Sequence, residues 1–507
     1  MVRKTATPLR KIRLYQFSNF DMEDFIERYL KIVNPHEEID PGTLSVYTLP
    51  STKITEARIG ARSKAIIENK CRYLQDAIIR RANSKKDSHT FTLNSNILKA
   101  VIRNDYKPLL EVLIDMGYIE MGDGMGGKDA YRYYQYSSYS RIYTLKKTDV
   151  YLTEPFINKT IQRYKEATIE EIKAIDDKYT YQPIKEKYGE SFLKRYMTSL
   201  RLIRIEDEEG LLKKIEEKQI EKEGRKLYYR NILDELKQKD RRIYKVDDSG
   251  RIYHILTNLD RELKQYLSID ITLDVKNSHP LLINYFIFNR LNINNTIGYN
   301  ISKFIGSYKS FIKGNDNHNV GRKLRMLLNI NGIEVESVAK LSDSELEYIY
   351  LTSTGQLWDE ITKRHPMLSR NDVKVEMFKS VYYPKSPVSD RWSFFASEFK
   401  AQFPDVYKLI ADWKRTKNAD VVVEYMRSHG LPTDKGSSSL SIAMMALESS
   451  IFTAILKKLY AKRWNAVHIH DCIVIPKGKD KNHPTIEQIQ QIMMEVYQEF
   501  GLYPSFG

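Results

Sequence analysis

The sequence predicts an α+β protein with several domains, and three observations lead to this prediction. The chain has 507 residues, enough for about two to four domains that each bury a core of their own. Residues 268–276 alternate apolar and polar side chains in the manner of a half-buried strand, and residues 464–476 form a second strand-like apolar segment. Charged and apolar residues at helical spacing fill much of the remaining sequence.

Residues 268–276 predict a strand that carries a carboxylate near its end. Asp274 is the last acidic residue of the alternating pattern. Pro280 and the apolar residues after it predict the start of a helix, because proline is tolerated in a first helical turn. A carboxylate at such a strand-to-helix junction is a common way to hold a hard divalent cation.

Residues 464–476 contain a His-Asp pair inside an apolar run. If the run were one strand, Asp471 would lie in the middle of its apolar face, where a carboxylate is costly. A turn at His470-Asp471 removes this cost, because it makes a hairpin whose tip presents the carboxylate to solvent or to a metal. The alternative is a single buried strand with a hydrogen-bonded aspartate.

Residues 370–382 carry two cations and two aromatic rings at a spacing of four residues. Arg370, Lys374, Phe378 and Tyr382 therefore share one face of a predicted helix. The cations suit a triphosphate, and a planar base and sugar can pack on the rings. The alternative is a solvated basic helix whose aromatic residues dip into the core.

The three segments together resemble the polymerase core of the family A nucleic-acid polymerases. This family contains bacterial DNA polymerase I and the single-subunit phage and mitochondrial RNA polymerases. An aspartate at a strand end, a helix with R-x3-K-x3-F-x3-Y and a His-Asp hairpin are its motifs A, B and C, and all three occur in this order. The resemblance covers about residues 240–507 and implies a right-hand polymerase core with palm, fingers and thumb.

The resemblance also implies roles for the motif residues. Asp274 and Asp471 would be the catalytic, metal-binding carboxylates of the palm, and they would hold two Mg²⁺ ions, with Mn²⁺ as a substitute. The nucleotide would contact motif B through Arg370 and Lys374 on the triphosphate and through Phe378 and Tyr382 around the base. Phosphoryl transfer asks a protein mainly for such positioning and charge neutralisation, so no nucleophilic side chain is needed.

Several positions depart from the family pattern, and they leave the choice of sugar open. His279 stands five positions after the motif A aspartate, where the DNA enzymes have a glutamate that excludes ribose and the RNA enzymes have glycine. Ser278 resembles the RNA enzymes, whereas Phe378 resembles the DNA enzymes. Cys472 follows the His-Asp pair, and Tyr383 replaces the usual glycine of motif B. His279 is therefore a nucleotide-binding candidate whose effect on ribose the sequence does not decide.

Three further residues are candidates for nucleic-acid contacts. Arg251 and Tyr253 belong to a Gly-Arg-x-Tyr element that resembles a template-strand contact of the single-subunit RNA polymerases. The alternative is an ordinary turn and strand. His470 joins them through motif C. Glu448, in the apolar helix predicted over residues 440–456, is interpreted first as a core residue.

The composition favours a nucleic-acid partner. The net charge is +15 and the chain has 35 tyrosines, which suits a surface that follows phosphates and stacks bases. Its two cysteines exclude a disulfide framework and a cysteine-rich zinc site. No apolar stretch approaches the roughly 18 residues of a membrane span, and the basic start lacks the apolar core of a signal peptide. We therefore expect a cytoplasmic protein without a membrane partner.

The N-terminal half predicts a candidate winged helix. Residues 91–102 and 105–116 predict two short helices, the second with Asp105 as its N-cap and Pro108 in its first turn. A glycine-rich loop at 122–127 and a returning strand over 131–145 follow. This outline is typical of duplex-binding modules. The alternative is a helix-hairpin unit that only braces the polymerase core.

The predicted organisation has four segments: an N-terminal arm over 1–60, the candidate winged helix over 61–150, a charged helical connector or thumb-like region over 151–240, and the palm and fingers over 241–507. The predicted function is template-directed nucleotidyl transfer by a two-metal mechanism, with a DNA template, a primer strand and nucleoside triphosphates as partners. The favoured interpretation is a DNA polymerase of a phage or mobile element, and the alternative is a single-subunit RNA polymerase or primase. The rival is a non-catalytic DNA-binding replication factor, and the oligomeric state is open.

Overall fold

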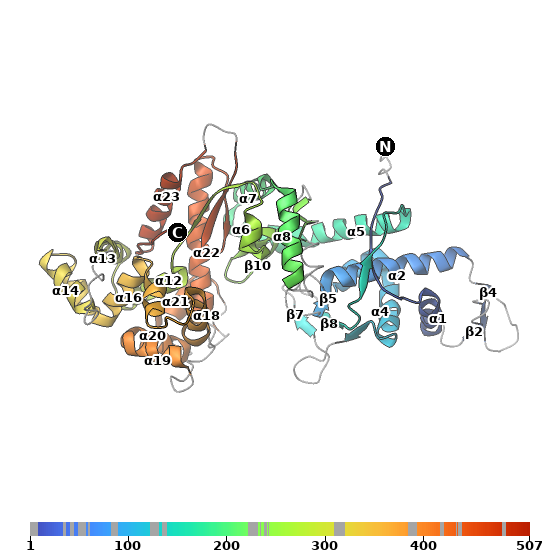
Figure 1. Cartoon of the computed structure of the whole chain (residues 1–507), viewed down its shortest axis with the longest axis horizontal. Coiled ribbons are helices and arrows are strands. Elements are labelled where there is room, and N and C mark those ends of the chain that lie inside the picture. The colour runs from blue at the N-terminus through green and yellow to red at the C-terminus, as the bar shows by residue number, and fades with distance from the viewer. Residues whose placement is uncertain are drawn as a thin grey trace. The chain divides into compact units, whose positions relative to one another are not determined.

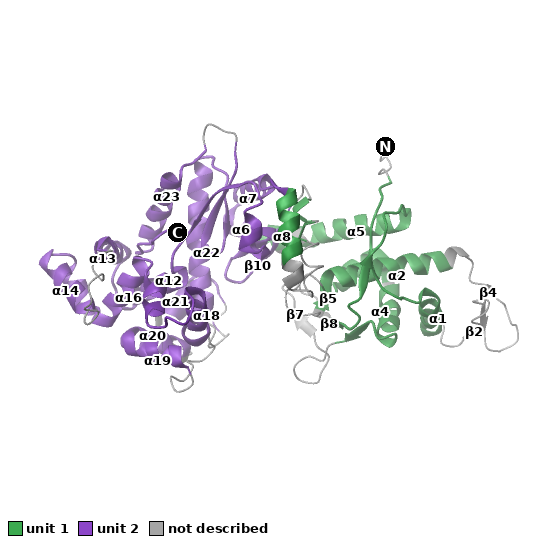
Figure 2. Cartoon of the chain, viewed as in Figure 1, with its two compact units in different colours: residues 1–183, 208–238 green, residues 184–207, 239–507 purple. Residues whose placement is uncertain are grey.

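The chain forms two compact units, which Figure 2 shows in different colours. Unit 1 contains residues 1–183 and 208–238, and unit 2 contains residues 184–207 and 239–507. The structure, a computed structural model, describes residues 9–33, 37–40, 45–48, 57–58, 61–82, 90–121, 131–133, 139–221, 232–233, 235–237, 241, 243–308, 320–383, 393–415, 420–431, 433, 439–478 and 483–507.

Unit 1 combines helices with small antiparallel sheets (Figure 1). Its elements are β1 (Tyr15–Phe17), α1 (Met22–Val33), β2 (Glu37–Asp40), β3 (Ser45–Thr48), β4 (Ala57–Arg58), α2 (Ala61–Ala82), β5 (Thr90–Thr92), α3 (Ser95–Ile102), α4 (Tyr106–Asp115), β6 (Ile119–Met121), β7 (Tyr131–Tyr133), β8 (Tyr139–Leu145), β9 (Val150–Leu152), α5 (Lys159–Asp176) and α8 (Glu208–Glu221). Strand β8 lies between β5 and β6 and also pairs with β7. Residues of α1 to α4 and of β1, β5, β6 and β8 share one hydrophobic core.

Helices α3 and α4 and the following strands confirm the helix-helix-strand outline predicted for this region, but residues 91 and 92 lie in strand β5 and the first helix begins only at Ser95. Asn94 caps α3, since its side chain accepts hydrogen bonds from the amides of Asn96 and Ile97. Asp105 occupies the predicted N-cap position of the second helix. Asp105 makes no capping bond and instead forms an ion pair with Lys70. The predicted glycine-rich loop at 122–127 lies outside the described residues.

Part of the predicted N-terminal arm is packed rather than loose. Strand β1 pairs with β9, and Tyr15, Phe17 and Phe25 are buried in the core of unit 1. The predicted connector over 151–240 is also divided, because residues 184–207 belong to unit 2. Long-range packing of apolar side chains, which the local sequence pattern does not show, accounts for both differences.

Unit 2 is built on a three-stranded antiparallel sheet surrounded by helices (Figure 1). Its elements are α7 (Glu190–Leu202), β10 (Ile243–Val246), β11 (Ile252–His254), α10 (Ile255–Asn258), α11 (Arg261–Lys264), β12 (Ile269–Asp274), α12 (Ser278–Arg290), α13 (Asn295–Ser307), α14 (Val320–Ile330), α15 (Val335–Lys340), α16 (Asp343–Ser353), α17 (Leu357–Lys363), α18 (Arg370–Met377), the π-helical turn η4 (Phe378–Tyr382), α19 (Phe394–Gln402), α20 (Pro404–Arg415), α21 (Asp420–Ser428), α22 (Ser439–Ala461), β13 (Val467–Ile469), β14 (Cys472–Pro476) and α23 (Ile486–Glu499). Helix α6 (Gln182–Tyr188) leads into this unit.

The sheet order is β12-β14-β13, so the two predicted strand segments are neighbours. Strands β13 and β14 form a hairpin with Ile469 opposite Cys472, and His470 and Asp471 make its two-residue turn. His470 has a positive φ of 56°, as turns of this kind require. The hairpin prediction is confirmed, and the alternative of one continuous strand is wrong.

Helix α22 corrects the expectation that no apolar stretch is long enough to span a membrane. Residues Leu440–Ala461 meet that length and composition, but 67% of the most apolar window is buried inside the unit. The helix packs against α12, α21, α23 and β13. Its apolar character is therefore that of a core helix.

Candidate active site

Asp274 and Asp471 lie on neighbouring backbone segments at one end of the sheet. Asp274 is directly opposite Cys472 in the β12-β14 register. The amide of Val275 donates to the carbonyl oxygen of Asp471 over 3.1 Å. The two carboxylates, 197 positions apart in the sequence, are thus carried by hydrogen-bonded backbone segments at one sheet edge.

The Asp471 carboxyl group lies in an environment that disfavours its negative charge. Burial and the charge of Glu448 raise its pKa to about 6, while the Lys374 ammonium acts in the opposite direction. Asp274 is exposed. A buried carboxyl group near the negative charge of Glu448 is an electrostatic setting that a bound divalent cation would relieve.

The residues fit a magnesium site only if the substrate completes it. Within the described ranges, no group of three or more His, Cys, Asp or Glu side chains could hold a metal ion. Magnesium commonly binds through one or two carboxylates together with substrate phosphates and water. Asp274 and Asp471 meet that smaller requirement.

Residues 505–507 run alongside the end of β12. The amide of Lys276 donates to Ser505 O over 2.8 Å, and the amide of Gly507 donates to Asp274 O over 3.0 Å. A Cβ atom at position 507 would lie 2.5 Å from Oδ1 of Asp274. A side chain at position 507 would therefore require the Asp274 carboxylate to shift.

Helix α18 carries the first two residues of motif B. A capping box between Ser369 and Asp372 begins the helix. Arg370 is exposed and forms an ion pair with Asp359, with 2.7 Å between Nε and Oδ1. Lys374 has its ammonium 5.9 Å from the centre of the Phe378 ring, and its charge acts on Asp471. Lys374 therefore lies near the carboxylates, whereas the Arg370 side chain is engaged at the surface.

The π-helical turn η4 changes which aromatic residues share the face of α18. The amide of Tyr383 donates to Phe378 O over 2.9 Å, a spacing of five residues. Tyr383 consequently stacks on Phe378, with ring centres 4.8 Å apart. The prediction that Tyr382 continues the four-residue spacing is wrong, because a π turn inserts one residue into that repeat.

Tyr382 is instead part of the core. Its side chain is fully buried, and its hydroxyl lies 3.0 Å from that of Tyr348. Its ring packs edge-on against Trp358 and Phe399. Tyr383 is 43% exposed and occupies the position expected for Tyr382. A direct contact between Tyr382 and a nucleotide stays a prediction, and Tyr383 is the ring that the sequence argument missed.

His279 is held by polar groups on two sides. Its Nδ1 lies 2.8 Å from the Tyr383 hydroxyl, and its Nε2 lies 2.8 Å from Nη2 of Arg251 and 3.3 Å from Glu448. The Phe378 ring lies edge-on to the imidazole with centres 6.0 Å apart. The imidazole of motif A and the aromatic residues of motif B thus meet.

Glu448 is the hub of this network. Its carboxylate is buried and accepts hydrogen bonds from Arg251 and from the Ser278 hydroxyl. Burial opposes its ionisation, but the charges of His279 and Arg251 hold its pKa well below the usual range. The core location predicted for Glu448 is confirmed, whereas its role as hub was missed. A single carboxylate within the apolar run 440–456 was the available signal.

Arg251, Tyr253 and His470 gather near the hairpin tip. The rings of Tyr253 and His470 are edge-on with centres 6.0 Å apart. Burial and the charge of Arg251 lower the pKa of His470. The Tyr253 hydroxyl donates to Asp247 over 2.9 Å, and the ammonium of Lys245 lies over its ring at 4.6 Å. The three candidate residues therefore lie near the turn that carries Asp471, although Arg251 is mostly buried by its pairing with Glu448.

A layer of buried polar side chains contacts strand β13 of the hairpin. His254 Nε2 lies 3.2 Å from the carbonyl oxygen of His468, and His468 Nδ1 lies 3.4 Å from the Tyr196 hydroxyl. Burial lowers the pKa of His254 to about 3 and that of His468 to about 4. This layer has no local sequence pattern, because its members come from α7, β11 and β13.

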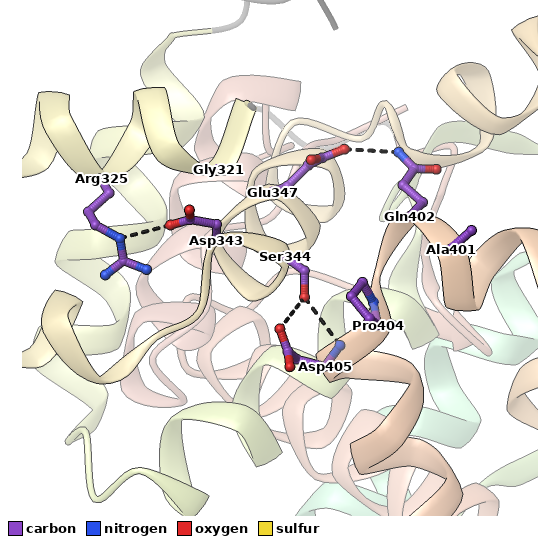
Figure 3. Close-up of a pocket in the computed structure, with 9 residues that line it drawn as sticks. All are labelled: Gly321, Arg325, Asp343, Ser344, Glu347, Ala401, Gln402, Pro404 and Asp405. Carbon is purple, nitrogen blue, oxygen red and sulfur yellow. Dashed lines mark hydrogen bonds and ion pairs between the residues drawn. The ribbon is translucent and has the colours of Figure 1, made fainter. Parts of the chain in front are cut away.

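An open pocket lies elsewhere in unit 2, between α14, α16, α19 and α20 (Figure 3). It contains none of the predicted site residues. Three of its lining side chains are acidic: Asp343, Glu347 and Asp405. Asp343 is paired with Arg325, and Glu347 accepts from Gln402 over 2.9 Å. This acidic lining does not suit a nucleotide phosphate.

Comparison with known proteins adds no relative. No protein-family model matches the chain, and no curated protein matches it at a significant level.

Proposed function

We propose that unit 2 catalyses template-directed nucleotidyl transfer. DNA synthesis is the favoured activity, and RNA synthesis or priming is the alternative. The main observation in support of this proposal is that residues from the three motif segments lie together. Asp274 and Asp471 are on adjacent backbone segments that are joined by hydrogen bonds. The charge of Lys374 stabilises the ionised form of the Asp471 carboxyl group. His279 contacts Tyr383 at the end of motif B.

The arrangement supports a division of roles. Asp274 and Asp471 would hold Mg²⁺, which when bound supplies charge neutralisation for the transferred phosphoryl group. Lys374 would bind the leaving phosphates, since a charge-assisted contact strengthens as charge develops there. Phe378 and Tyr383 offer a stacked aromatic surface next to His279, which suits the base and sugar of a nucleotide.

The proposed DNA contact of unit 1 has less support from its second helix. The exposed face of α4 carries Lys107, Glu111 and Asp115, and two of these three groups repel phosphates. In a helix that enters the major groove this face would meet the DNA. If unit 1 binds DNA, other elements would provide the contact, so the rival function of a non-catalytic DNA-binding factor gains nothing from α4.

The test is a primer-extension assay on DNA and RNA templates, with deoxy- and ribonucleotides offered separately. DNA synthesis predicts primer elongation with deoxynucleotides in the presence of Mg²⁺ or Mn²⁺. Elongation or primer-free synthesis with ribonucleotides alone would favour the RNA polymerase or primase alternative. Template binding without any incorporation would favour the non-catalytic factor.

A further inference from the structure

Three polar side-chain ends meet the backbone of Gly250 in unit 2. A Cβ atom at this glycine would lie 2.8 Å from the Tyr188 hydroxyl, 2.9 Å from the Lys187 ammonium and 3.1 Å from the Ser449 hydroxyl. Gly250 also has a positive φ of 85°. The absence of a side chain at this position therefore allows groups from α6 and α22 to converge on the loop before β11.

One of the convergent groups, the Ser449 hydroxyl, is buried without a hydrogen-bond partner. The Ser449 side chain is only 3% exposed. The neighbouring Nε of Arg251 is also buried without a partner, although Nη2 of the same guanidinium is paired with Glu448. A buried polar group without a partner destabilises the protein, so these two donors favour an acceptor supplied by a ligand.

Two ammonium groups lie beside the convergent groups. The Lys187 and Lys457 ammonium groups lie 5.3 and 5.9 Å from the centre of the Tyr188 ring, and both lysines are exposed. The carboxylate of Asp247 in the same loop accepts from the Ser249 hydroxyl, the Arg251 amide and the Tyr253 hydroxyl. The Glu448 carboxylate is likewise occupied by Arg251 and Ser278. An incoming anion would therefore meet donors and ammonium groups.

We propose that Lys187, Tyr188 and Ser449, which converge beside the backbone of Gly250, form a binding site for a phosphate group of a nucleic-acid strand. This site rests on the proposed function, because it adds a strand contact to the polymerase core. The donors are of the types that contact phosphate oxygens in protein–nucleic acid complexes. Lys457 adds charge at the edge of the site.

The experiment measures binding of a fluorescein-labelled primer–template duplex by fluorescence anisotropy, with no nucleotide present, from about 50 to about 200 mM KCl. Each phosphate that the protein neutralises contributes about 0.9 to the slope of log affinity against log salt for a duplex and about 0.7 for a single strand. Lys187→Ala is expected to weaken binding several-fold and to reduce this slope by slightly less than one. Lys340→Ala is the matched control, because Lys340 is an exposed lysine of the same unit on α15.

Ser449→Ala gives a second, uncharged test. It is expected to weaken duplex binding while leaving the salt slope unchanged, because it removes a donor and no charge. Thermal unfolding of each variant checks that it is folded. Equal effects of Lys187→Ala and Lys340→Ala on the slope, or no effect of Lys187→Ala and Ser449→Ala in folded protein, would overturn the site.

Free phosphate groups are the other source of the same chemistry. Inorganic phosphate and a nucleoside triphosphate are therefore added as competitors at millimolar concentration. A strand-specific site predicts that neither displaces the duplex from the wild-type protein more than chloride of equal ionic strength does. Displacement that Lys187→Ala abolishes would overturn the assignment to a strand.

The outcome is separable from that of the polymerase proposal. A reduced slope for Lys187→Ala in a protein that extends no primer would leave the strand site standing without polymerisation. Primer extension by the wild type together with an unchanged salt slope for Lys187→Ala would support polymerisation and exclude the strand site.

Discussion

The hydroxyl of Tyr383 lies 2.8 Å from Nδ1 of His279. This contact exists because the π-helical turn η4 places Tyr383, and not Tyr382, over the ring of Phe378. Arg251 approaches the other imidazole nitrogen, and a guanidinium only donates hydrogen bonds. The Glu448 carboxylate also lies 3.3 Å from this nitrogen. The imidazole is fixed on both sides.

The first prediction concerns sugar discrimination by this fixed imidazole. We expect deoxynucleotides to be only modestly preferred, and His279→Ala to lower the preference further by removing the ring that crowds the ribose 2′-hydroxyl. Tyr383→Phe should lower it in the same direction by releasing the imidazole. The measurement is the ratio of kcat/KM for deoxy- and ribonucleotides.

Tyr382→Phe is the matched control for this prediction. It removes a hydroxyl that bonds to Tyr348 inside the core, so it should change stability more than the ratio. If Tyr382→Phe alters the ratio and Tyr383→Phe does not, the assignment of Tyr383 to the sugar site is wrong.

The second prediction concerns Lys374. Lys374→Ala should raise the KM for nucleotides and slow single-turnover incorporation by about 10-fold to 100-fold, which corresponds to roughly 1.5–3 kcal/mol for a hydrogen bond to a charged group. Lys379→Ala is the control, because Lys379 is exposed and pairs with Glu376. Equal incorporation rates in Lys374→Ala and in the wild type would contradict this role and favour the alternative that α18 is a solvated basic helix.

The third prediction concerns Lys414, which is buried on α20 and donates to the carbonyl oxygen of Val381 within the π turn. Burial lowers its pKa to about 8. Lys414→Met leaves this carbonyl unpaired, at a cost of about 1–3 kcal/mol, and should loosen the turn that holds Tyr383. We expect a lower deoxy-to-ribo ratio together with a small loss of Tm.

Lys408→Met, at an exposed position of the same helix, should change neither quantity. A Lys414→Met variant that loses stability but keeps the wild-type ratio would show that Lys414 supports the fold without positioning Tyr383.

The fourth prediction concerns acid sensitivity. Burial holds the pKa of His254 near 3 and that of His468 near 4, below the ordinary 6.5. Between these values the unfolded chain binds more protons than the folded chain, so stability is fully present above pH 6.5 and falls as the pH drops below it. One pH unit below 6.5 should cost about 1 kcal/mol for each histidine.

The measurement for this prediction is the change in Tm between about pH 7 and about pH 5.5. His468→Phe should show a smaller change than the wild type, because the ring no longer binds a proton in the unfolded chain. His429→Gln, at an exposed position, should behave like the wild type. A steeper pH dependence in His468→Phe would contradict the assignment.

The sequence predicted the parts of the site whose pattern is local. The alternation ending at Asp274 and the cost of burying Asp471 in an apolar strand were sufficient to predict β12 and the hairpin. Both the strand and the hairpin are present.

The sequence did not predict features that depend on tertiary contacts. A π turn has no strong local signature, so the residue inserted between Phe378 and Tyr383 was not foreseen. Glu448 was interpreted as a core residue because its partners, Arg251 and Ser278, are distant in the sequence. The length and apolar composition of α22 were underestimated, although its burial in unit 2 accounts for both.

The most direct test of the central claim is single-turnover extension of a bound primer by wild-type protein, Asp471→Asn and Asp274→Asn in Mg²⁺. Asp270→Asn on the same strand, at an exposed position paired with His483, is the control. The account predicts that both motif variants bind the primer–template like the wild type but extend it at least about 1000-fold more slowly, which corresponds to a loss of roughly 4 kcal/mol of transition-state stabilisation. Asp270→Asn should extend at the wild-type rate. Extension by Asp471→Asn or Asp274→Asn at the rate of the control would contradict the two-carboxylate polymerase site.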